Sequence, residues 1–368
     1  MPDPQAFMET ALALAGQALR HTSPNPRVGC VLVSPDGQVL GQGRTQVAGG
    51  AHAEVMALRD AASRGPSVMG ATAWVTLEPC SHQGRTGPCC DALVAAGIAR
   101  VVASLPDPNP LVSGEGFRRL RAAGVEVIIG PGAAASRELN IGFFSRMVRK
   151  TPWVRMKTAA SLDGKTALDN GTSQWITSEP ARIDGHAWRA RACAVLTGIG
   201  TVLEDDPRLD VRLVQTSRQP RLVIVDSRLE TPLDAKLFIE GRPVLIYCAQ
   251  ADPARTQGLE RRGATVVPMP GPGGKVDLAA MLADLAKREV NELHVEAGHK
   301  LNGSLVREGL VDDYLVYLAP KLIGQGRDMA SLGPLATLDA AVPLTFQSFD
   351  RIGPDLRILA RANGHDDF

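Results

Sequence analysis

The stretch LEPCSHQGRTGPCC, Leu77 to Cys90, contains three of the six cysteines and one of the seven histidines of the chain. A cluster of this kind can form a structural metal site, a redox pair or part of a catalytic centre. The residues before it decide between these uses. The segment GGAHAEVMAL, Gly49 to Leu58, places His52 and Glu54 where a glycine-rich turn enters a helix, and the intervening ATAWVTL has the apolar character of a buried strand.

His52 and Glu54, followed by Pro79-Cys80, have the H-x-E…P-C arrangement of zinc deaminases. Residues two apart on a regular helix point in different directions, so the pair can converge only at the helix entrance. One imidazole and two thiolates bind Zn²⁺ and leave a fourth position for water, whose pKa the metal lowers to about 7. A carboxylate that is not a ligand must then carry the proton. We therefore expect His52, Cys80 and a second thiolate to bind zinc, and Glu54 to be catalytic.

The second thiolate is less obvious, because the usual P-C-x-x-C ending is absent. Position 83 is Gln, and eight residues, SHQGRTGP, separate Cys80 from Cys89. Cys89 precedes a predicted helix, whose positive end would favour a thiolate, so we expect Cys89 rather than Cys90 to be the third ligand. A closed zinc site with His82 or Cys90 as fourth ligand is the structural alternative, and the upstream HAE disfavours it. A redox pair lacks the C-x-x-C spacing.

Composition limits what the whole chain can be. Its 368 residues are too many for one ordinary core, so we expect two domains. A net charge of +1 provides no basic surface field for nucleic acid. The apolar runs are too short to span a bilayer, the first residues lack a signal-peptide core, and six cysteines in a chain of this length do not form a disulfide scaffold. We expect a cytoplasmic protein with a small-molecule partner, and neither nucleic acid nor membrane.

Strand and helix patterns alternate along both halves, which predicts an α/β fold with largely parallel sheets. We expect a single helix over about 134–149, ending before Pro152, since proline disfavours helix in the residue before it. This predicts domains at residues 1–150 and 151–368. The second half is richer in strand candidates, among them WVRMKTAAS, AVLTG, RLVIVDS, PVLIYC, ELHVEAG and YLVYLAP.

The segments SPNPRVGCVLV, GGAHAEVMAL, VTLEPCSHQGRTGPCCDAL and ASLPDPNP together resemble the bifunctional deaminase/reductase family of riboflavin biosynthesis, in which a long gap between the two cysteines is typical. The resemblance implies a cytidine-deaminase-like α/β/α domain that removes the C2 amine of 2,5-diamino-6-ribosylamino-4(3H)-pyrimidinone 5′-phosphate. It also implies substrate contacts from Asn25, His82, Arg85, Asp107 and Asn109. From the residues alone, PDPNP could equally be a rigid turn and Arg85 a solvated charge.

In the second half, MKTAASLDGKTA, SQWITS, GIGTVLEDDPRLDVR, VIVDS, VEAG and YLAPKLIG match the reductase half of the same family in order. The resemblance implies a dihydrofolate-reductase-like α/β domain that uses NADPH to reduce the ribosyl chain of the deaminated product. The implied NADPH contacts are Ala159, Trp175, Thr201, Asp205, Ser227, Gly298, His299, Lys300, Leu301, Asn302, Gly303 and Ser304. The implied substrate contacts are Ser173, Arg189, Leu209, Arg212 and Glu296. We further expect a homo-oligomer, a dimer or a tetramer.

Without the resemblance, the second half gives only a weak indication of a dinucleotide-binding site. Gly198 and Gly200 lack the third glycine of G-x-G-x-x-G, because Leu203 stands in its place. A strand ending at Glu296 and a helix starting near Gly303 would offer backbone N–H groups to a diphosphate, although an ordinary strand–helix connection explains them equally well. No role is assigned to Lys157 or Asp163, nor to His299 and Lys300 beyond their place in the implied NADPH loop.

Two other functions fit part of the pattern. A nucleoside or tRNA-base deaminase would share HAE and PC, but it leaves the second half without a role, and the near-zero net charge disfavours RNA. A non-catalytic, zinc-stabilised binding module would keep the fold. A structural zinc site, however, has no need of the carboxylate of Glu54 two residues after the histidine.

Overall fold

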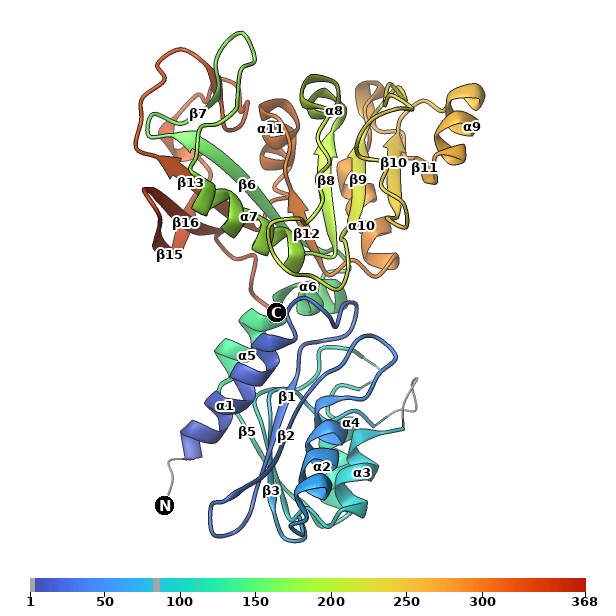
Figure 1. Cartoon of the computed structure of the whole chain (residues 1–368), viewed down its shortest axis with the longest axis vertical. Coiled ribbons are helices and arrows are strands. Elements are labelled where there is room, and N and C mark those ends of the chain that lie inside the picture. Colours follow the sequence, from blue (N-terminus) through green and yellow to red (C-terminus); the bar gives the residue numbers. More distant parts are fainter. Residues whose placement is uncertain (1–3, 82–86, 111) are drawn as a thin grey trace. The chain divides into compact units, whose positions relative to one another are not determined.

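The computed structural model describes residues 4–81, 87–110 and 112–368. It contains two compact units, Met1–Arg149 together with Phe368, and Lys150–Asp367 (Figure 1). Both units are layered α/β structures, as the alternating pattern predicts. None of the helices in the described ranges combines the length and the apolar character needed to span a bilayer.

The first unit contains a five-stranded sheet in the order β2-β1-β3-β4-β5. β1 pairs antiparallel with β2 and β3, whereas β3, β4 and β5 run parallel. The strands are β1 (Gly29–Val33), β2 (Val39–Arg44), β3 (Thr72–Val75), β4 (Arg100–Ala103) and β5 (Glu126–Ile129). The helices are α1 (Pro4–Gln17), α2 (Ala53–Arg64), α3 (Cys89–Ala95), α4 (Glu115–Ala122), α5 (Ala133–Leu139) and α6 (Ile141–Val148).

Both faces of this sheet are covered by helices (Figure 1). In β1, Cys30 and Leu32 belong to the core that contains Ala57 of α2, whereas Val31 packs in the cluster that contains Met8 of α1. Successive side chains of a strand point to opposite faces, so the continuous apolar run GCVLV suits a strand buried on both sides. The result is an α/β/α arrangement of three layers.

Two glycines of β2 determine how closely α2 approaches the sheet. A Cβ atom added at Gly41 would lie 2.3 Å from the carbonyl oxygen of Ala57, and one at Gly43 would lie 2.2 Å from that of Ala53. No larger residue fits at these distances, so the glycines let α2 lie directly on the strand. The first turn of α2, which carries Glu54, is thereby held at a defined place on the sheet.

The single helix expected over about 134–149 is two helices, α5 and α6, which meet at Asn140. The Asn140 side chain accepts a hydrogen bond from the backbone N–H of Arg27 at 2.7 Å and donates to the carbonyl oxygen of Arg27 at 2.9 Å. A buried amide that bonds a distant backbone segment competes with regular helix at this position. The expectation of one helix was therefore wrong.

The second unit contains a nine-stranded sheet in the order β11-β10-β9-β8-β12-β6-β13-β16-β15. The strands from β11 to β13 are parallel, and β16 and β15 continue the sheet antiparallel. The strands are β6 (Trp153–Ser161), β8 (Ala194–Gly198), β9 (Arg221–Val225), β10 (Val244–Cys248), β11 (Ala264–Pro268), β12 (Glu292–Val295), β13 (Asp313–Ala319), β15 (Leu344–Ile352) and β16 (Asp355–Ala362); β7 (Lys165–Ala167) pairs separately with β14 (Arg327–Asp328).

Five helices flank the parallel strands: α7 (Glu179–Arg191), α8 (Ile199–Asp205), α9 (Pro253–Arg261), α10 (Leu278–Lys287) and α11 (His299–Arg307). The last begins at His299, not near Gly303 as expected, because the carbonyl oxygen of Gly298 already accepts from the N–H of Asn302 at 3.1 Å. Gly303 lies inside the helix, where a Cβ would approach the carbonyl oxygen of Ser331 to 2.1 Å. Close packing, rather than a helix start, accounts for this glycine.

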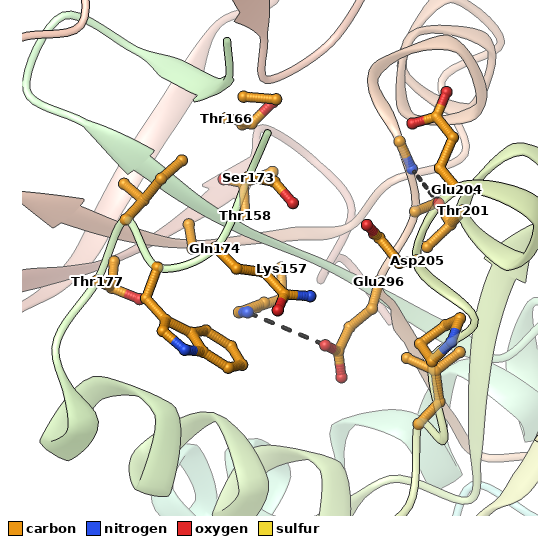
Figure 2. A pocket seen from close by; sticks show the side chains of 18 of the residues that line it. Lys157, Thr158, Thr166, Ser173, Gln174, Thr177, Thr201, Glu204, Asp205 and Glu296 are labelled. Carbon is orange, nitrogen blue, oxygen red and sulfur yellow. Dashed lines mark hydrogen bonds and ion pairs between the residues drawn. The ribbon is translucent and has the colours of Figure 1, made fainter. Parts of the chain in front are cut away.

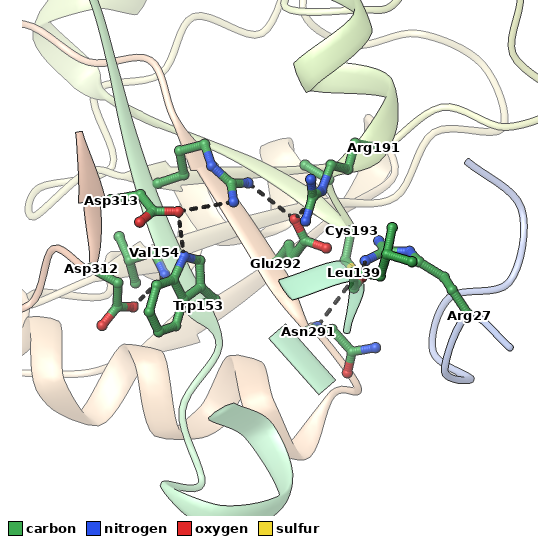
Figure 3. A network of polar contacts seen from close by, with 12 residues as sticks. Arg27, Leu139, Trp153, Val154, Arg191, Cys193, Asn291, Glu292, Asp312 and Asp313 are labelled. Atoms are coloured by element: carbon green, nitrogen blue, oxygen red, sulfur yellow. Dashed lines mark hydrogen bonds and ion pairs between the residues drawn. The ribbon is translucent and has the colours of Figure 1, made fainter. Parts of the chain in front are cut away.

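A buried ionic network lies where β6, β12 and β13 are neighbours (Figure 3). The guanidinium of Arg155 contacts the carboxylate of Glu292 at 3.0 Å and that of Asp313 at 3.1 Å. Arg191 adds a second contact to Glu292 at 2.7 Å, and the Trp153 indole donates to Asp313 at 2.7 Å. Desolvation offsets much of the Coulombic gain of such groups, so loss of one partner is costly mainly because it leaves the other charge buried and unpaired.

Candidate active sites

The metal-binding candidates of the first unit converge from three elements. His52 is the residue before α2, Cys80 lies in the loop after β3, and Cys89 opens α3. The Nδ1 atom of His52 lies 3.5 Å from Sγ of Cys80 and 3.3 Å from Sγ of Cys89, and all three ligand atoms lie within 4.8 Å of one another. One imidazole and two thiols at this spacing match the three-ligand donor set of a catalytic zinc site.

The two thiols lie close together and shift each other's pKa in opposite directions. The Cys89 side chain stabilises a thiolate on Cys80 and lowers the pKa of Cys80 to about 4, while the same contact raises the pKa of Cys89. The backbone N–H of Cys89 also donates to Sγ of Cys80 at 3.4 Å. A metal ion binds such a pair by displacing the remaining proton.

Glu54 lies in the first turn of α2, and only 3% of it is exposed. Among the described residues, Glu54 is not a member of the metal-binding group, yet it lies close enough to Cys89 for that side chain to lower its pKa. Burial raises the pKa of Glu54 to about 7, and the negative charge of Cys80 adds to this rise. The carboxylate is therefore beside the triad and shielded from water.

The thiol of Cys90 points elsewhere. Its Sγ donates to the carbonyl oxygen of Pro79 at 3.1 Å and lies 3.5 Å from that of Gly116. Burial raises the pKa of Cys90 to about 12. The geometry thus separates the two adjacent cysteines, one facing His52 and the other packed against the backbone.

Glu78, two residues before Cys80, organises the surrounding loops and was not singled out by sequence reasoning. Its buried carboxylate accepts backbone N–H groups of four residues: Asp107 at 3.1 Å, Gly114 at 2.9 Å, Gly116 at 2.8 Å and Phe117 at 3.3 Å. These four residues are therefore tied to the loop that leads from β3 to Cys80. In the sequence, this role could have been suspected because Glu78 is an acidic residue that follows a buried strand and directly precedes Pro79-Cys80.

We expect Glu78→Gln to weaken deamination through the loop that it holds. The amide keeps one acceptor oxygen but presents an N–H₂ group to two backbone donors, and each unsatisfied buried group costs about 1–3 kcal/mol. Thermal unfolding should shift to lower temperature and the KM for deamination should rise, with zinc content unchanged. Glu126→Gln, which alters an exposed partner of Arg100, is the matched control. An unchanged KM and melting temperature would remove Glu78 from this role.

Of the predicted substrate residues of the first unit, Asn25, Asp107 and Asn109 lie within the described ranges. Asp107 is 7% exposed, its Oδ1 accepts from the N–H of Asn109 at 2.8 Å, and burial raises its pKa to about 7. The Cys80 thiolate contributes to the same rise, which places Asp107 near the triad. Asn25 is half-buried in the turn between α1 and β1. His82 and Arg85 lie outside the described residues. The contacts of these residues with substrate stay predictions.

In the second unit, a cavity of about 500 Å³ opens beside the carboxyl ends of β6, β8 and β12. Ligands of open α/β sheets bind at such strand ends. All five predicted substrate residues line it: Ser173, Arg189, Leu209, Arg212 and Glu296. So do seven of the predicted NADPH residues: Ala159, Trp175, Thr201, Asp205, Gly298, His299 and Asn302.

The floor of this cavity is charged. Figure 2 shows Lys157 and Glu296 pointing toward one another, and their Nζ and Oε2 atoms are 3.9 Å apart. Arg189 forms a bidentate pair with Glu296, at 2.7 and 2.9 Å. Burial raises the pKa of Glu296, but the charges of Arg189 and Lys157 outweigh it and hold that pKa well below its usual range. Glu296 is therefore an ionised acceptor inside the cavity.

The N-terminus of α11 faces the same cavity. Its first residue, His299, and the preceding Gly298 line the wall, and the N–H of Gly298 donates to Oγ1 of Thr201 at 3.1 Å (Figure 2). Below them, the Oδ1 atom of Asn302 is buried and has no hydrogen-bond partner within the described part of the chain. Free N–H groups at a helix start suit a diphosphate, so the wall fits a dinucleotide.

Other predicted NADPH residues are not on this wall. The side chain of Leu301 packs against Gly198, and Gly303 packs against the backbone of Ser331. Lys300 is exposed. Ser304 bonds the carbonyl oxygen of Lys300 at 3.2 Å, and Ser227 accepts from Ala249 and Gln250 through its backbone. The structure thus brings part of the predicted set together, and the roles of the rest stay predictions.

Sequence reasoning missed several charged residues of the cavity wall, namely Arg182, Glu204, Arg208 and Arg327. Arg327 contacts Glu204 at 2.5 Å, and the Arg182 guanidinium stacks over the Trp175 ring at 4.5 Å. Asp163, to which the sequence assigned no role, stabilises a loop by accepting hydrogen bonds from the backbone N–H groups of Ile323 and Gly324. Glu204 and Arg208 both lie inside the segment GIGTVLEDDPRLDVR, so the sequence offered an indication for these two residues.

Both units match known families. Residues 152–358, more than half of the chain, match the RibD C-terminal domain, and residues 1–105 match the cytidine and deoxycytidylate deaminase zinc-binding region. The riboflavin biosynthesis protein RibD of Escherichia coli (strain K12) is 44% identical over 359 residues, covering 95% of this chain and 97% of the relative. The corresponding protein of Aquifex aeolicus (strain VF5) is 40% identical over 352 residues, covering 96% of each.

Solved structures agree over almost the full length. RibD of Acinetobacter baumannii superimposes with a TM-score of 0.88 at 38% identity, covering 98% of both chains. A diaminohydroxyphosphoribosylaminopyrimidine deaminase/5-amino-6-(5-phosphoribosylamino)uracil reductase from Thermotoga maritima gives 0.86 at 32% identity, covering 97% of this chain and 98% of that one. These matches confirm the predicted fold class and the two cofactors, zinc for the first unit and NADPH for the second. The chain belongs to the RibD family of bifunctional deaminase/reductases of riboflavin biosynthesis.

Proposed function

We propose that the first unit hydrolyses the C2 amine of 2,5-diamino-6-ribosylamino-4(3H)-pyrimidinone 5′-phosphate. The second unit then reduces the ribosyl chain of the product with NADPH to give 5-amino-6-(5-phospho-ribitylamino)uracil. The observation that carries this proposal is the triad of His52, Cys80 and Cys89 with the buried, non-ligand Glu54 beside it. The charged cavity of the second unit supports the second step.

In the deaminase site, His52, Cys80 and Cys89 would hold zinc, which would supply a water molecule that ionises near neutral pH. Glu54 accepts a first proton from the attacking water as its oxygen bonds to C2, and delivers this proton to the neighbouring ring nitrogen. Glu54 then carries the second proton, from the new C2 hydroxyl, to the amine, so that the C2–N bond breaks, C2 becomes a carbonyl and ammonia leaves. Asp107 and Asn109 hold the ribose phosphate, and Asn25, His82 and Arg85 complete the contacts.

In the reductase site, the α11 N-terminus and Thr201 would hold the diphosphate of NADPH, which would supply the hydride. Glu296 accepts hydrogen bonds from sugar hydroxyls, because it stays ionised beside Arg189. The protein's contribution is to align C1 of the opened ribose with the nicotinamide and to exclude water. Trp175, exposed over 62% of its surface on the cavity rim, offers a flat apolar wall for this purpose.

We also infer a homo-oligomer in the cytoplasm with no role for nucleic acid. The edge strand β15 supports self-association, since Phe346 and Phe349 are exposed over 61% and 59% of their surfaces and their ring centres lie 4.8 Å apart. Exposed aromatic residues on a sheet edge are a typical contact surface. Sedimentation equilibrium tests this inference, and a monomer at all concentrations would contradict it.

The division of labour between the units is tested with Arg212→Ala. Arg212 lines the reductase cavity and lies far along the chain from the triad, so its loss should raise the KM for reduction of the deaminated intermediate about tenfold or more. Ammonia release should stay within about twofold of the unaltered enzyme, an ordinary spread for a remote site. A parallel fall in both activities would contradict two separate sites.

A further inference from the structure

The two cysteine ligands of the first unit are joined by a long connection. Two residues separate the thiols in P-C-x-x-C, whereas eight residues separate Cys80 from Cys89 in this chain. The entropic cost of bringing two points of a chain together grows with the number of residues between them, so a longer connection fixes the distance between the thiols less by itself. Contacts outside the connection therefore have to hold the two thiols at a common distance.

The helix α4 contacts the residues next to both ligands. The backbone N–H of Gly116 donates to the Glu78 carboxylate at 2.8 Å, and a Cβ atom added at Gly116 would lie 2.1 Å from the carbonyl oxygen of Pro79. On the side of α3, Sγ of Cys90 lies 3.5 Å from the carbonyl oxygen of Gly116. The first turn of α4 is thus packed against the segment before Cys80 and against the start of α3.

Arg119, one turn further along α4, bonds both of these segments. Its Nη1 donates to the carbonyl oxygen of Ser81 at 3.0 Å, and its Nη2 lies 2.7 and 2.8 Å from the two carboxylate oxygens of Asp91. Ser81 is buried and directly follows Cys80, while Asp91 lies in the first turn of α3, two residues after Cys89. One guanidinium therefore bridges the two pieces of chain that carry the thiols.

The direct contacts between the two pieces of chain are longer. The backbone N–H of Cys90 donates to the carbonyl oxygen of Cys80 at 3.2 Å, and that of Cys89 donates to Sγ of Cys80 at 3.4 Å. The hydrogen bonds of Arg119 are charge-assisted, which makes them stronger than neutral ones. The side chains of Arg119 and Asp91 are 45% and 48% exposed, so their ion pair adds little to global stability. The bridge therefore matters for local geometry more than for the stability of the unit.

We propose that Arg119 is a positioning residue of the deaminase metal site, which holds Ser81 and Asp91, and through them Cys80 and Cys89, at the separation that one zinc ion requires. Arg119 acts through the chain beside the ligands and is not itself a catalytic residue. Loss of a group that orients metal ligands typically weakens metal binding by about ten- to a hundredfold. This inference rests on the proposed function and adds to its zinc site a residue outside the H-x-E and P-C motifs.

The test measures metal affinity in the full-length protein after its metal has been removed. Zn²⁺ is titrated against a chelator of known affinity, and Co²⁺ binding is followed by its absorbance. Arg119→Met keeps the apolar stem but removes the donors, and it should weaken zinc binding about tenfold. Its Co²⁺ complex should also lose intensity in the thiolate-to-metal charge-transfer band, because the two thiolates are no longer held at a common distance. Arg119→Lys should recover only part of the affinity, since a compact ammonium lacks the planar fork that reaches both partners.

Arg118→Met is the matched control, because Arg118 is the neighbouring residue of α4 and pairs with Glu115 of the same helix. Its zinc affinity should stay within about twofold of the unaltered protein, the usual range for a surface substitution. Asp91→Asn is a second, independent variant that should weaken zinc binding less than Arg119→Met, because the bond to Ser81 remains. If the unaltered protein binds zinc and Arg119→Met binds it as tightly as Arg118→Met does, the bridge is wrong and the proposed function stands. If the unaltered protein binds no zinc, the proposed function itself fails.

Discussion

Replacing Glu54 with Gln should lower kcat for deamination by roughly 10²- to 10⁴-fold, the range for loss of a positioned acid–base group. The amide has nearly the same shape as the carboxylate but cannot accept and return the proton. Since Glu54 is not among the metal-binding side chains of the described residues, zinc content should stay at about one ion per chain. Ammonia release and metal analysis on the same preparation measure both quantities.

NADPH oxidation with supplied deaminated intermediate is the internal control for this variant, because that reaction belongs to the other unit. A variant that released ammonia at near the original rate would exclude Glu54 as the proton carrier. One that lost its zinc would show instead that the carboxylate supports the metal site. The two outcomes are distinguishable in a single preparation.

Cys89→Ser should remove zinc and, with it, all deamination, whereas Cys90→Ser should retain both. Cys89 lies 3.3 Å from Nδ1 of His52, while Cys90 donates to the carbonyl oxygen of Pro79. A serine hydroxyl is a far weaker zinc ligand than a thiolate, since the metal requires a deprotonated donor. Metal content per chain after dialysis, measured for the two variants side by side, is the readout.

The adjacent positions make these variants controls for one another, because each removes one buried thiol from the same end of α3. The assignment would be contradicted if Cys90→Ser lost zinc and Cys89→Ser kept it. Loss of zinc in both would indicate that the start of α3 is too sensitive to report on ligands. Far-ultraviolet circular dichroism then separates unfolding from metal loss.

The triad could be anticipated from the sequence because each ligand lies at the start of a helix or beside a strand end that local pattern predicts. His52 precedes a recognisable helix, and Cys89 follows a Gly-Pro pair before another. Glu78 was missed because its role depends on four backbone N–H groups supplied by a segment about 30 to 40 residues away. Such long-range pairing leaves no periodic trace in the sequence.

The second unit shows the same limit. Arg208 lies in the segment GIGTVLEDDPRLDVR and Arg189 lies outside the quoted segments, yet nothing local in the sequence shows which arginine has its donors occupied within the protein. The donors of Arg189 are occupied by Glu296, which the fold brings from the end of β12, whereas Arg208 pairs with Asp210 two residues along its own segment. The start of α11 was misplaced for a related reason, because Gly303 serves close packing against Ser331.

The central claim is that one chain performs two successive reactions on the same phosphorylated pyrimidine. Zinc-loaded enzyme should be given 2,5-diamino-6-ribosylamino-4(3H)-pyrimidinone 5′-phosphate, first without NADPH and then with it, while ammonia and NADPH are both measured. We predict ammonia release in the first stage and then oxidation of one NADPH per ammonia released. Ammonia release with no NADPH consumption, or NADPH consumption before any ammonia appears, would contradict the claim.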